Sequence, residues 1–324
     1  MTSKKPFIVP FSKLTKKDAK TAGGKGASLG EMTKAKIPVP PGFVIVADAF
    51  DYFISGKSSK EVSEVGLEIK SELSKVDFES ASSIDRASEK IRDIMADTKT
   101  PKELEEEIKK EFKKLKAKYV AVRSSATAED SSIASWAGEL ETYLNTTEKT
   151  LLQNVKRCWS SLFTPRAIFY RYEKNMADLK VAVAVVVQEM VESEISGIAF
   201  TVHPVTKDKN QLIIEAGYGL GEAVVSGQIT PDSYVVDKRD FSILDVNIAE
   251  QKKMLVRKGV SGNNTWKAVS KAKQEHQKLL GSQIIELAKL CAHIEKHYKK
   301  PQDIEWAYAK GKFYITQSRP ITTL

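Results

Sequence analysis

The sequence predicts an α+β protein in which a mainly helical N-terminal half is followed by a mainly stranded C-terminal half. Apolar residues recur at helical spacing within residues 57–117 and 151–162, whereas β-branched segments separated by glycine-bearing turns begin near residue 181. The chain has 324 residues. That length allows two lobes, because single hydrophobic cores stop growing at about 250–300 residues.

The composition and charge pattern argue against a nucleic-acid-binding, membrane or secreted protein. The net charge is +9, but residues of both signs alternate in segments such as "PKELEEEIKKEFKKLKAK". This pattern is typical of solvated helix faces, and no aromatic-plus-basic motif accompanies it, so attraction to polyphosphate is favoured over nucleic-acid binding. The N-terminus lacks the apolar core of a signal peptide, and no apolar run is long enough to span a bilayer. Cys158 and Cys291 lie far apart, so we expect a cytoplasmic protein without a disulfide or a membrane segment.

The N-terminal half begins with a glycine-bearing loop, "TAGGKGASLGEM", that leads into a short helix. Prolines in "IPVPPGFVIV" end this helix before a β-branched strand. Helices are expected within 57–117, and the last of them opens with a capping box at Thr100 and Glu103. The segment "YVAVR" then predicts a strand that ends at Arg123.

The middle of the chain alternates between a loop and an apolar helix. Residues 124–137, "SSATAEDSSIASWA", are small and polar, which predicts a flexible loop. A helix with one apolar face is expected over 151–162, and Pro165 closes it.

The C-terminal half reads mainly as strands. The segments "VAVAVVVQEM", "SGIAFTV", "QLIIEA" and "SYVVDK" predict four of them. A long helix is expected from about 270 to 299, ending in lysines that suit its negative dipole end. The last segment, "DIEWAYAKGKFYITQSRP", predicts a hairpin with Lys310 and Gly311 in its turn.

The loop around Lys25 is the first candidate binding element. It is not a P-loop, because Gly26 follows the lysine where Ser or Thr is required, and its glycines do not match the dinucleotide fingerprint. Successive small residues nevertheless expose backbone N–H groups before a helix N-terminus, and a lysine lies among them, which favours an anion. A plain glycine turn with a solvated lysine is the alternative that this loop alone leaves open.

The terminal hairpin is the second candidate binding element. Gln317 and Arg319 are two residues apart and therefore share a face of their strand. If the loop has three residues, 310–312, Glu305 lies opposite Gln317, whereas a two-residue loop points the two side chains to opposite faces. The first register groups a carboxylate, an amide oxygen and a guanidinium, which suits magnesium polyphosphate. A polar pair on a solvated edge is the alternative.

Three further motifs carry weaker hypotheses. His203, in "FTVHPVT", is interpreted as a hydrogen-bonded turn residue rather than a phosphoryl acceptor. His293 and His297 have a spacing that could bind zinc, but no third ligand accompanies them, so we expect solvated or packing residues. The segment "GYGLGE", from Gly217 to Glu222, is interpreted as a glycine hinge near phosphates combined with a tight strand-to-strand turn.

Five motifs, in this order, resemble the nucleotide-binding domain of the family of phosphoenolpyruvate synthase, pyruvate phosphate dikinase and rifampin phosphotransferase, and phosphoenolpyruvate synthase most of all. They are "GGKGASLGEM", "VAVRSSATAEDSSIASWAGELETYL", "VVVQEMVESEISGIAFTVHPVT", "IIEAGYGLGEAVVSGQITPDSYVVDK" and "IEWAYAKGKFYITQSRPITTL". The resemblance covers essentially the whole chain. It implies an ATP-grasp fold in which two α+β lobes, expected at 1–187 and 188–324, clasp ATP and Mg²⁺.

The resemblance also implies which residues form the site. Those with a catalytic role on the phosphates are Lys25, Arg123 and Arg319. Two more residues match triphosphate contacts, Gly138 and Thr142. The segment that passes the adenine contains Gln188, Met190 and Val191. The magnesium ligands are Glu305 and Gln317.

The activity that the resemblance implies is a phosphoryl transfer. ATP is cleaved to AMP and phosphate, and a phosphoryl group passes from the β position to a histidine of a swivelling domain, which serves a pyruvate-binding domain. The sequence stops just after "QSRPITTL", where the swivelling domain normally begins, so both domains are expected as partners in cis or in trans. Two alternatives stay open: a nucleotide-binding regulatory module without turnover, and the ATP domain of a rifampin phosphotransferase-like enzyme. The sequence leaves the final acceptor open among pyruvate, rifampin, water and phosphate, and overall similarity favours pyruvate.

Overall fold

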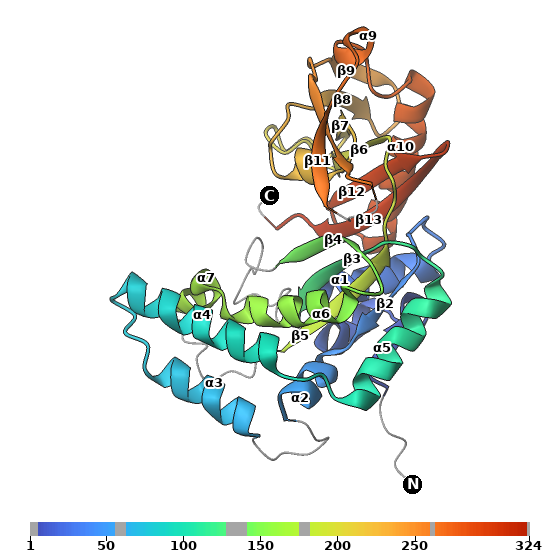
Figure 1. The fold of residues 1–324 in the computed structure, drawn as a ribbon. Coiled ribbons are helices and arrows are strands. Elements are labelled where there is room, and N and C mark those ends of the chain that lie inside the picture. The colour runs from blue at the N-terminus through green and yellow to red at the C-terminus, as the bar shows by residue number, and fades with distance from the viewer. Residues whose placement is uncertain (1–5, 56–62, 128–140, 175–181, 260–262, 323–324) are drawn as a thin grey trace. The chain divides into compact units, whose positions relative to one another are not determined.

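The computed structural model describes residues 6–55, 63–127, 141–174, 182–259 and 263–322 (Figure 1). These residues form helices and antiparallel sheets, which confirms the predicted α+β class. The chain divides into two compact units. The N-terminal unit comprises residues 1–31 and 41–190, and the C-terminal unit comprises residues 32–40 and 191–324.

A five-stranded antiparallel sheet, in the order β1–β2–β5–β3–β4, forms the centre of the N-terminal unit. Its strands are β1 (Ile8–Pro10), β2 (Gly42–Ile45), β3 (Val120–Ala126), β4 (Thr142–Thr146) and β5 (Val183–Glu189). The valine-rich β5 lies between β2 and β3, and its residues are buried almost throughout. A strand buried on both faces needs apolar side chains at every position, which explains why this segment shows no alternation.

Helices flank this sheet. They are η1 (Phe11–Lys13), η2 (Lys16–Asp18), α1 (Ala19–Lys34), α2 (Ala47–Ser55), α3 (Glu64–Ser74), α4 (Ala81–Asp97), α5 (Lys102–Leu115), α6 (Leu151–Ser160), η3 (Ser161–Phe163) and α7 (Pro165–Glu173). Helix α6 packs on β3, β4 and β5, and α4 packs against α3, α6 and α7 (Figure 1). The core between them is centred on Trp159, which is fully buried and stacks on Phe53 at 4.8 Å between ring centroids.

Two local predictions for the N-terminal unit are wrong. Helix α5 has Pro101 as its N-cap and no side-chain capping hydrogen bond, so Thr100 and Glu103 do not form a capping box. Glu103 instead accepts a hydrogen bond from the Tyr52 hydroxyl. Residues 124–126 are strand rather than loop, because β3 continues to pair with β5 as far as Ala126. The remainder of the predicted loop, from residue 128, lies outside the described residues.

The C-terminal unit contains a six-stranded antiparallel sheet with the order β13–β12–β6–β7–β8–β9 (Figure 1). Its strands are β6 (Ile195–Phe200), β7 (Gln211–Tyr218), β8 (Asp232–Asp237), β9 (Ile243–Asn247), β12 (Gln302–Ala309) and β13 (Lys312–Pro320). A separate two-stranded ribbon pairs β10 (Lys253–Arg257) with β11 (Asn264–Ala268). Helices α8 (Glu222–Val225), α9 (Lys271–Gln274) and α10 (Gly281–Tyr298) complete the unit, and α10 packs on β7, β8 and β12.

The single long helix predicted for 270–299 is wrong, because the chain breaks between α9 and α10. Lys278 lies in the break, and its side chain is 0% exposed. Its ammonium Nζ donates to Asp232 Oδ1 at 2.7 Å, and its backbone N–H donates to Oδ2 of the same carboxylate at 2.8 Å. The Tyr234 hydroxyl also donates to that carboxylate, at 2.7 Å. The buried charge of Lys278 is thus paired with a carboxylate that also binds its backbone N–H. This pairing keeps residue 278 outside the helix.

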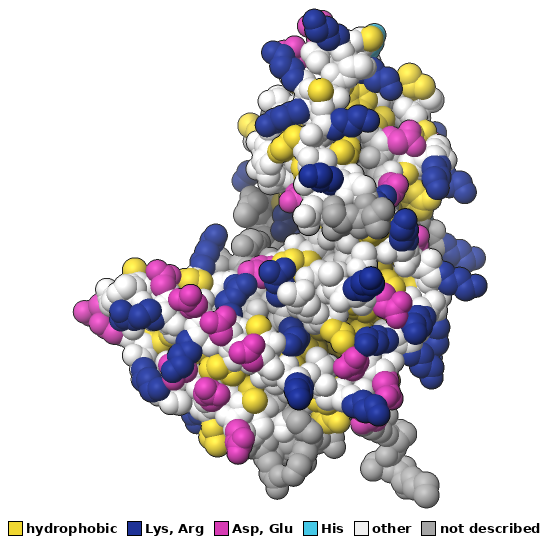
Figure 2. All heavy atoms as spheres, viewed as in Figure 1, with side chains coloured by type: hydrophobic (Ala, Val, Ile, Leu, Met, Phe, Trp, Pro, Cys, Tyr) yellow, Lys and Arg dark blue, Asp and Glu magenta, His cyan; other side chains and the backbone are white. Residues whose placement is uncertain are grey.

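Charged side chains of both signs are interspersed over the helices of the N-terminal unit, on the face that Figure 2 shows. Within α5, Lys114 pairs with Glu111 at 2.8 Å and Lys109 pairs with Glu105 at 2.5 Å. These short-range pairs agree with the solvated helix face that the charge pattern predicted. In the described part of the chain, no helix is both long enough and apolar enough to cross a membrane.

Candidate functional site

The segment predicted as a glycine-bearing loop lies within α1, which is kinked at Gly23, and it packs tightly against the end of β3. Gly23 has φ 69° and ψ 168°, a backbone conformation that is essentially restricted to glycine. A Cβ atom at this position would lie 2.1 Å from Ser125 Oγ. The Ser125 hydroxyl donates to the carbonyl of Ala22 at 3.1 Å and accepts from the backbone N–H of Gly26 at 3.3 Å. The glycines therefore allow the loop to approach the strand closely, and the serine holds it there.

Three residues predicted to bind phosphate come together in the N-terminal unit. Lys25 Nζ donates to the carbonyl of Ser124 at 3.2 Å, which places the lysine beside Arg123. Arg123 is half-buried in the middle of β3, rather than at its end as the sequence predicted. Its direct cross-strand partner is Thr142, at the start of β4, so the two side chains share a face. Gly138 lies outside the described residues.

The residues predicted to pass the adenine lie where the chain leaves the N-terminal unit. Gln188 is on β5 between Gly42 and Ala121, and it is 2% exposed. Its amide nitrogen Nε2 has no hydrogen-bond partner among the described residues, although an unpaired buried donor is costly. Met190 donates its backbone N–H to the carbonyl of Tyr119 at 3.0 Å.

Val191 is the first residue of the C-terminal unit after this crossing, so the predicted adenine segment spans the division between the units. Its carbonyl accepts from the backbone N–H of Ser193 at 2.9 Å. The sequence placed the division between 187 and 188, and the compact units divide between 190 and 191.

In the C-terminal unit, Glu305 and Gln317 are direct cross-strand partners on β12 and β13. Of the two loop lengths considered, the structure has the shorter, because Ala309 pairs with Lys312 and only Lys310 and Gly311 turn the chain. Both turn residues have positive φ, 50° and 75°, as a two-residue type I′ turn requires.

A β-bulge corrects the register that this short loop would otherwise impose. Glu305 pairs with Gln317, but Trp306 pairs with Ile315, so Thr316 is an extra residue in β13. Without the bulge, Thr316 would lie opposite Glu305 and Gln317 would point to the other face. The two predicted metal ligands are thus paired by a device that the sequence did not indicate.

Asp303 also belongs to this group, although it was not among the residues predicted for the site. It is the cross-strand partner of Arg319, and the Arg319 guanidinium donates to Asp303 Oδ2 at 2.8 Å through both Nε and one terminal amine. Burial raises the pKa of the Asp303 carboxyl, while the Arg319 guanidinium opposes that shift and the Glu305 carboxylate adds to it. The signal that could have found Asp303 is its position two residues before Glu305, on the same face of the strand.

The donor set of this group fits Mg²⁺. Carboxylate oxygens of Asp303 and Glu305 and the amide oxygen of Gln317 are hard ligands of the kind that Mg²⁺ prefers. Among the residues that the structure describes, no group of three or more His, Cys, Asp or Glu side chains could hold a metal by itself. A partial protein set is what Mg²⁺ uses when substrate phosphates and water supply its other ligands.

Three histidines carried hypotheses from the sequence: His203, His293 and His297. His203 Nδ1 accepts hydrogen bonds from the backbone N–H groups of Val205 and Thr206, each at 3.2 Å, which agrees with a turn residue. His293 and His297 lie one turn apart on α10, and His293 is exposed.

The "GYGLGE" segment connects β7 to α8, so it is a strand-to-helix turn rather than the predicted strand-to-strand turn. Gly219 has φ 91°, and a Cβ atom there would lie 2.4 Å from the carbonyl oxygen of Leu255. The Gly219 carbonyl accepts from the hydroxyls of Ser193 and Ser196 at 2.9 and 2.6 Å. Glycine at this position lets the turn pack directly on β10.

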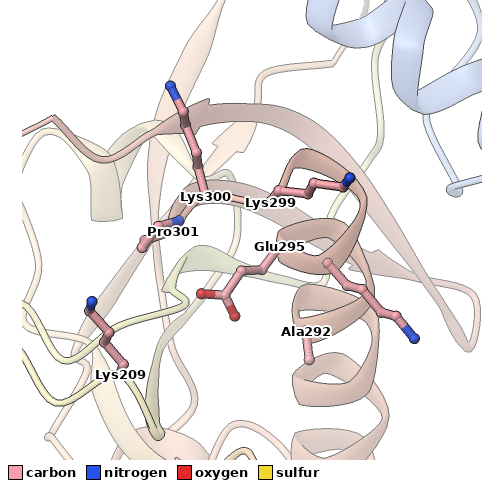
Figure 3. A pocket seen from close by; sticks show the side chains of 7 residues that line it. Lys209, Ala292, Glu295, Lys299, Lys300 and Pro301 are labelled. Atoms are coloured by element: carbon pink, nitrogen blue, oxygen red, sulfur yellow. The ribbon is translucent and has the colours of Figure 1, made fainter.

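A surface pocket of about 450 Å³ at the C-terminal end of α10 contains none of the predicted site residues. Its lining comprises Lys209, Ala292, Glu295, Lys296, Lys299, Lys300 and Pro301 (Figure 3). The side chains of Lys299 and Lys300 point in different directions in Figure 3, so their ammonium groups do not converge on one ligand. Glu295 is paired with Lys238 at 2.7 Å, which ties the end of β8 to α10.

The chain is similar to known proteins over nearly its whole length. Residues 19–324 match the family described as pyruvate phosphate dikinase, AMP/ATP-binding domain. A probable phosphoenolpyruvate synthase of Archaeoglobus fulgidus is 48% identical over 98% of this chain and 42% of its own length. The phosphoenolpyruvate synthase of Pyrococcus furiosus is 45% identical over 98% of this chain and 44% of its own length. The rifampicin phosphotransferase of Bacillus subtilis is 37% identical over 98% of this chain and 36% of its own length.

The chain therefore spans less than half the length of these curated relatives. The match to the family covers all five motifs that carried the resemblance, and it confirms that resemblance. The chain belongs to the AMP/ATP-binding domain family of pyruvate phosphate dikinase, and its α+β fold is of the ATP-grasp type.

Proposed function

We propose that this chain is the ATP-binding, phosphoryl-activating domain of a phosphoenolpyruvate synthase-like phosphotransferase. In this function ATP is cleaved to AMP and phosphate, and the phosphoryl group of the β position passes to a histidine on a separate swivelling domain. The observation that supports the proposal most directly is the grouping of Lys25, Arg123 and Thr142, three predicted phosphate contacts that lie far apart in the sequence.

The physical reason lies in the charge of the transferred group. Phosphoryl transfer is catalysed mainly by positioning and by fixed charges that meet the phosphate oxygens. Lys25 is held in place through the carbonyl of Ser124, and Arg319 is oriented by Asp303, so neither cation must be ordered when the nucleotide binds. When bound, Mg²⁺ would neutralise phosphate charge, and Asp303, Glu305 and Gln317 would hold it.

The base of the nucleotide would lie along Gln188, Met190 and Val191. The buried amide nitrogen Nε2 of Gln188, which has no partner among the described residues, would gain a hydrogen-bond acceptor from the adenine edge. This gain would favour a purine that presents an acceptor at that position. The proposed adenine contact therefore explains an otherwise costly feature of β5.

We also propose the partners that this function requires. A histidine-bearing swivelling domain would receive the phosphoryl group, and a pyruvate-binding domain would use it, in cis or in trans. Seven relatives named phosphoenolpyruvate synthase or probable phosphoenolpyruvate synthase are 41 to 48% identical, against 37% for the rifampicin phosphotransferase, which favours pyruvate over rifampicin as the final acceptor.

The test is phosphoryl transfer to a histidine domain taken from a phosphoenolpyruvate synthase and supplied separately. We expect the chain to bind Mg·ATP and to produce AMP and phosphate only when that domain is present. Lys25→Ala and Arg319→Ala are each expected to lower the transfer rate by about 10²-fold or more. Lys209→Ala, in the pocket at the end of α10, serves as a matched control for loss of one lysine.

Two results would contradict the proposal in different ways. Unchanged transfer in both Lys25→Ala and Arg319→Ala would remove these residues from the site. Mg·ATP binding without any AMP, in the presence of a histidine domain that is active with its own ATP domain, would favour a regulatory nucleotide-binding module.

A further inference from the structure

An ion pair between α4 and the start of β4 lies beside the proposed phosphate-binding residues. The two terminal amines of Arg92 donate to the two carboxylate oxygens of Glu141, at 2.9 and 3.3 Å. The Tyr143 hydroxyl donates to the same carboxylate, and the Arg157 guanidinium lies over the Tyr143 ring, 5.2 Å from its centroid. Glu141 is therefore held from two sides, by a helix and by its own strand.

The backbone of Glu141 continues this network toward Lys25. The Glu141 carbonyl accepts from the backbone N–H of Ser124 at 3.1 Å and from the Ser124 hydroxyl at 2.9 Å. The Ser124 carbonyl in turn accepts from Lys25 Nζ at 3.2 Å. Thr142, the cross-strand partner of Arg123, directly follows Glu141 in the chain. Glu141 thus connects α4 to all three predicted phosphate contacts, which are Lys25, Arg123 and Thr142.

The geometry of the pair makes it stronger than an ordinary surface ion pair. Arg92 and Glu141 are each 30% exposed, and two parallel N–H to oxygen bonds fix both the distance and the orientation of the carboxylate. By contrast, Lys90 on the same helix contacts Glu72 through a single ammonium, and the lysine is 55% exposed. The first pair can hold a strand in place, whereas the second is a solvated contact.

The hydrophobic packing of α4 does not depend on this ion pair. The buried face of α4 comprises Ile84, Ala87, Ser88, Ile91 and Met95. Arg92 borders instead a surface cavity of about 690 Å³, so its removal leaves no void in the core. A variant at this position is therefore expected to fold.

We propose that Arg92 and Glu141 are positioning residues for the phosphate end of the nucleotide site. Arg92 fixes the Glu141 carboxylate, and Glu141 fixes Ser124 and the first residue of β4, so that Lys25, Arg123 and Thr142 keep their mutual placement. Neither residue is required to touch the nucleotide. The inference rests on the proposed ATP-binding function and adds to it the structural element that orders its phosphate contacts.

The test uses three variants, Arg92→Ala, Arg92→Lys and Glu141→Gln. It measures amide hydrogen exchange without nucleotide and the Kd values for Mg·ATP and adenosine. Without nucleotide, amide hydrogen exchange in peptides that cover 120–126 and 141–146 is expected to become about 5-fold faster or more in Arg92→Ala. With nucleotide, the Kd for Mg·ATP is expected to rise about 10-fold while the Kd for adenosine changes less than about 2-fold. Arg92→Lys is expected to restore part of both effects, because it keeps the charge and loses the bidentate geometry.

Lys90→Ala is the matched control, since it removes a cation and an ion pair from the same helix. It is expected to leave the exchange rates and both Kd values within about 2-fold of the wild type. An equal rise of the ATP and adenosine Kd values in Arg92→Ala would show a general structural role and overturn the proposal. Unchanged exchange in β3 and β4 would overturn it as well. If the wild-type chain does not bind Mg·ATP, the proposed function itself fails and the positioning role falls with it, whereas the exchange rates still report whether Arg92 fixes β4.

Discussion

Glu305 and Gln317 are direct cross-strand partners, although a loop of only two residues joins their strands. The extra residue that makes this possible, Thr316, forms a β-bulge in the middle of the hairpin. The bulge lies next to the two side chains that the pairing brings together, as is common beside functional sites. This local irregularity determines whether a carboxylate and an amide oxygen can share a metal ion.

The first prediction concerns metal dependence. Removal of Mg²⁺ is expected to weaken ATP binding to the wild-type chain by about 10-fold or more, because the metal links the phosphates to the oxygen ligands of the hairpin. In Glu305→Gln the same removal is expected to change the Kd less than about 3-fold. Titration of ATP with Mg²⁺ and with a chelator measures both values. Asp245→Asn, an exposed carboxylate on β9, is the control, and an equal metal effect in Glu305→Gln would exclude Glu305 as a ligand.

The second prediction concerns the glycine loop. Gly23→Ala is expected to lower the free energy of unfolding by about 3 kcal/mol or more, because it combines a disallowed backbone conformation with a clash against Ser125. Gly227 has a similar φ, 67°, but a Cβ atom there would meet no heavy atom of the described residues within 4 Å. Gly227→Ala is therefore expected to cost only about 1 kcal/mol. Urea unfolding of both variants separates the cost of the backbone conformation from the cost of the clash with Ser125. An equal loss of unfolding free energy in the two variants would show that the close approach to Ser125 does not matter.

The third prediction concerns the buried pair of Asp232 and Lys278. Lys278→Met is expected to destabilise the protein by about 3–5 kcal/mol, because it leaves a fully buried carboxylate without its counter-charge. Lys102→Ala removes an exposed lysine that lies 4.0 Å from Glu106 and is expected to cost less than about 0.5 kcal/mol. Chemical denaturation measures both. A loss below about 1 kcal/mol in Lys278→Met would show that the carboxylate finds another partner or a proton.

The fourth prediction concerns pH. Burial raises the pKa of Asp303 above its ordinary value, so the folded state binds a proton at this carboxyl more readily than the unfolded state does. The stability of the wild type, relative to Asp303→Asn, is therefore expected to decrease as pH rises from the ordinary Asp value through the raised one, and to stay constant above it. Denaturation of both proteins across the acidic range measures this difference. A wild type that gains stability over the same interval would show that the attraction to Arg319 outweighs burial.

Much of the secondary structure follows from local patterns. The valine-rich β5, the strands β6, β7 and β8 and the terminal hairpin were all predicted, because β-branched segments and turn residues act over a few positions. The helix predicted across 270–299 failed for a non-local reason. Asp232, far away on β8, binds both the side chain and the backbone of Lys278, and no pattern within the helix reports that contact.

The candidate site likewise combines features that follow from local sequence with features that depend on contacts between distant residues. The motifs around Lys25, Arg123, Glu305, Gln317 and Arg319 identify the family, because each keeps its residue types and spacing within one short segment. The pairing of Asp303 with Arg319 could have been inferred from the hairpin once its register was known. The contact of Arg92 with Glu141 could not, because the two residues are far apart in the sequence and meet only when α4 packs on α6, which in turn packs on β3, β4 and β5.

The sequence alone thus determined the α+β class and the family, and it indicated the segments that we propose to bind the nucleotide, since these depend on residue types at short spacing. Only the structure decided the bulge that pairs Glu305 with Gln317, the break before α10 and the contact of Arg92 with Glu141. The bulge is a shift in the pairing of two strands, and no residue pattern within either strand reports it. The break and the contact depend on hydrogen bonds and ion pairs between residues distant in the chain, and their free energy is realised only after the elements have packed.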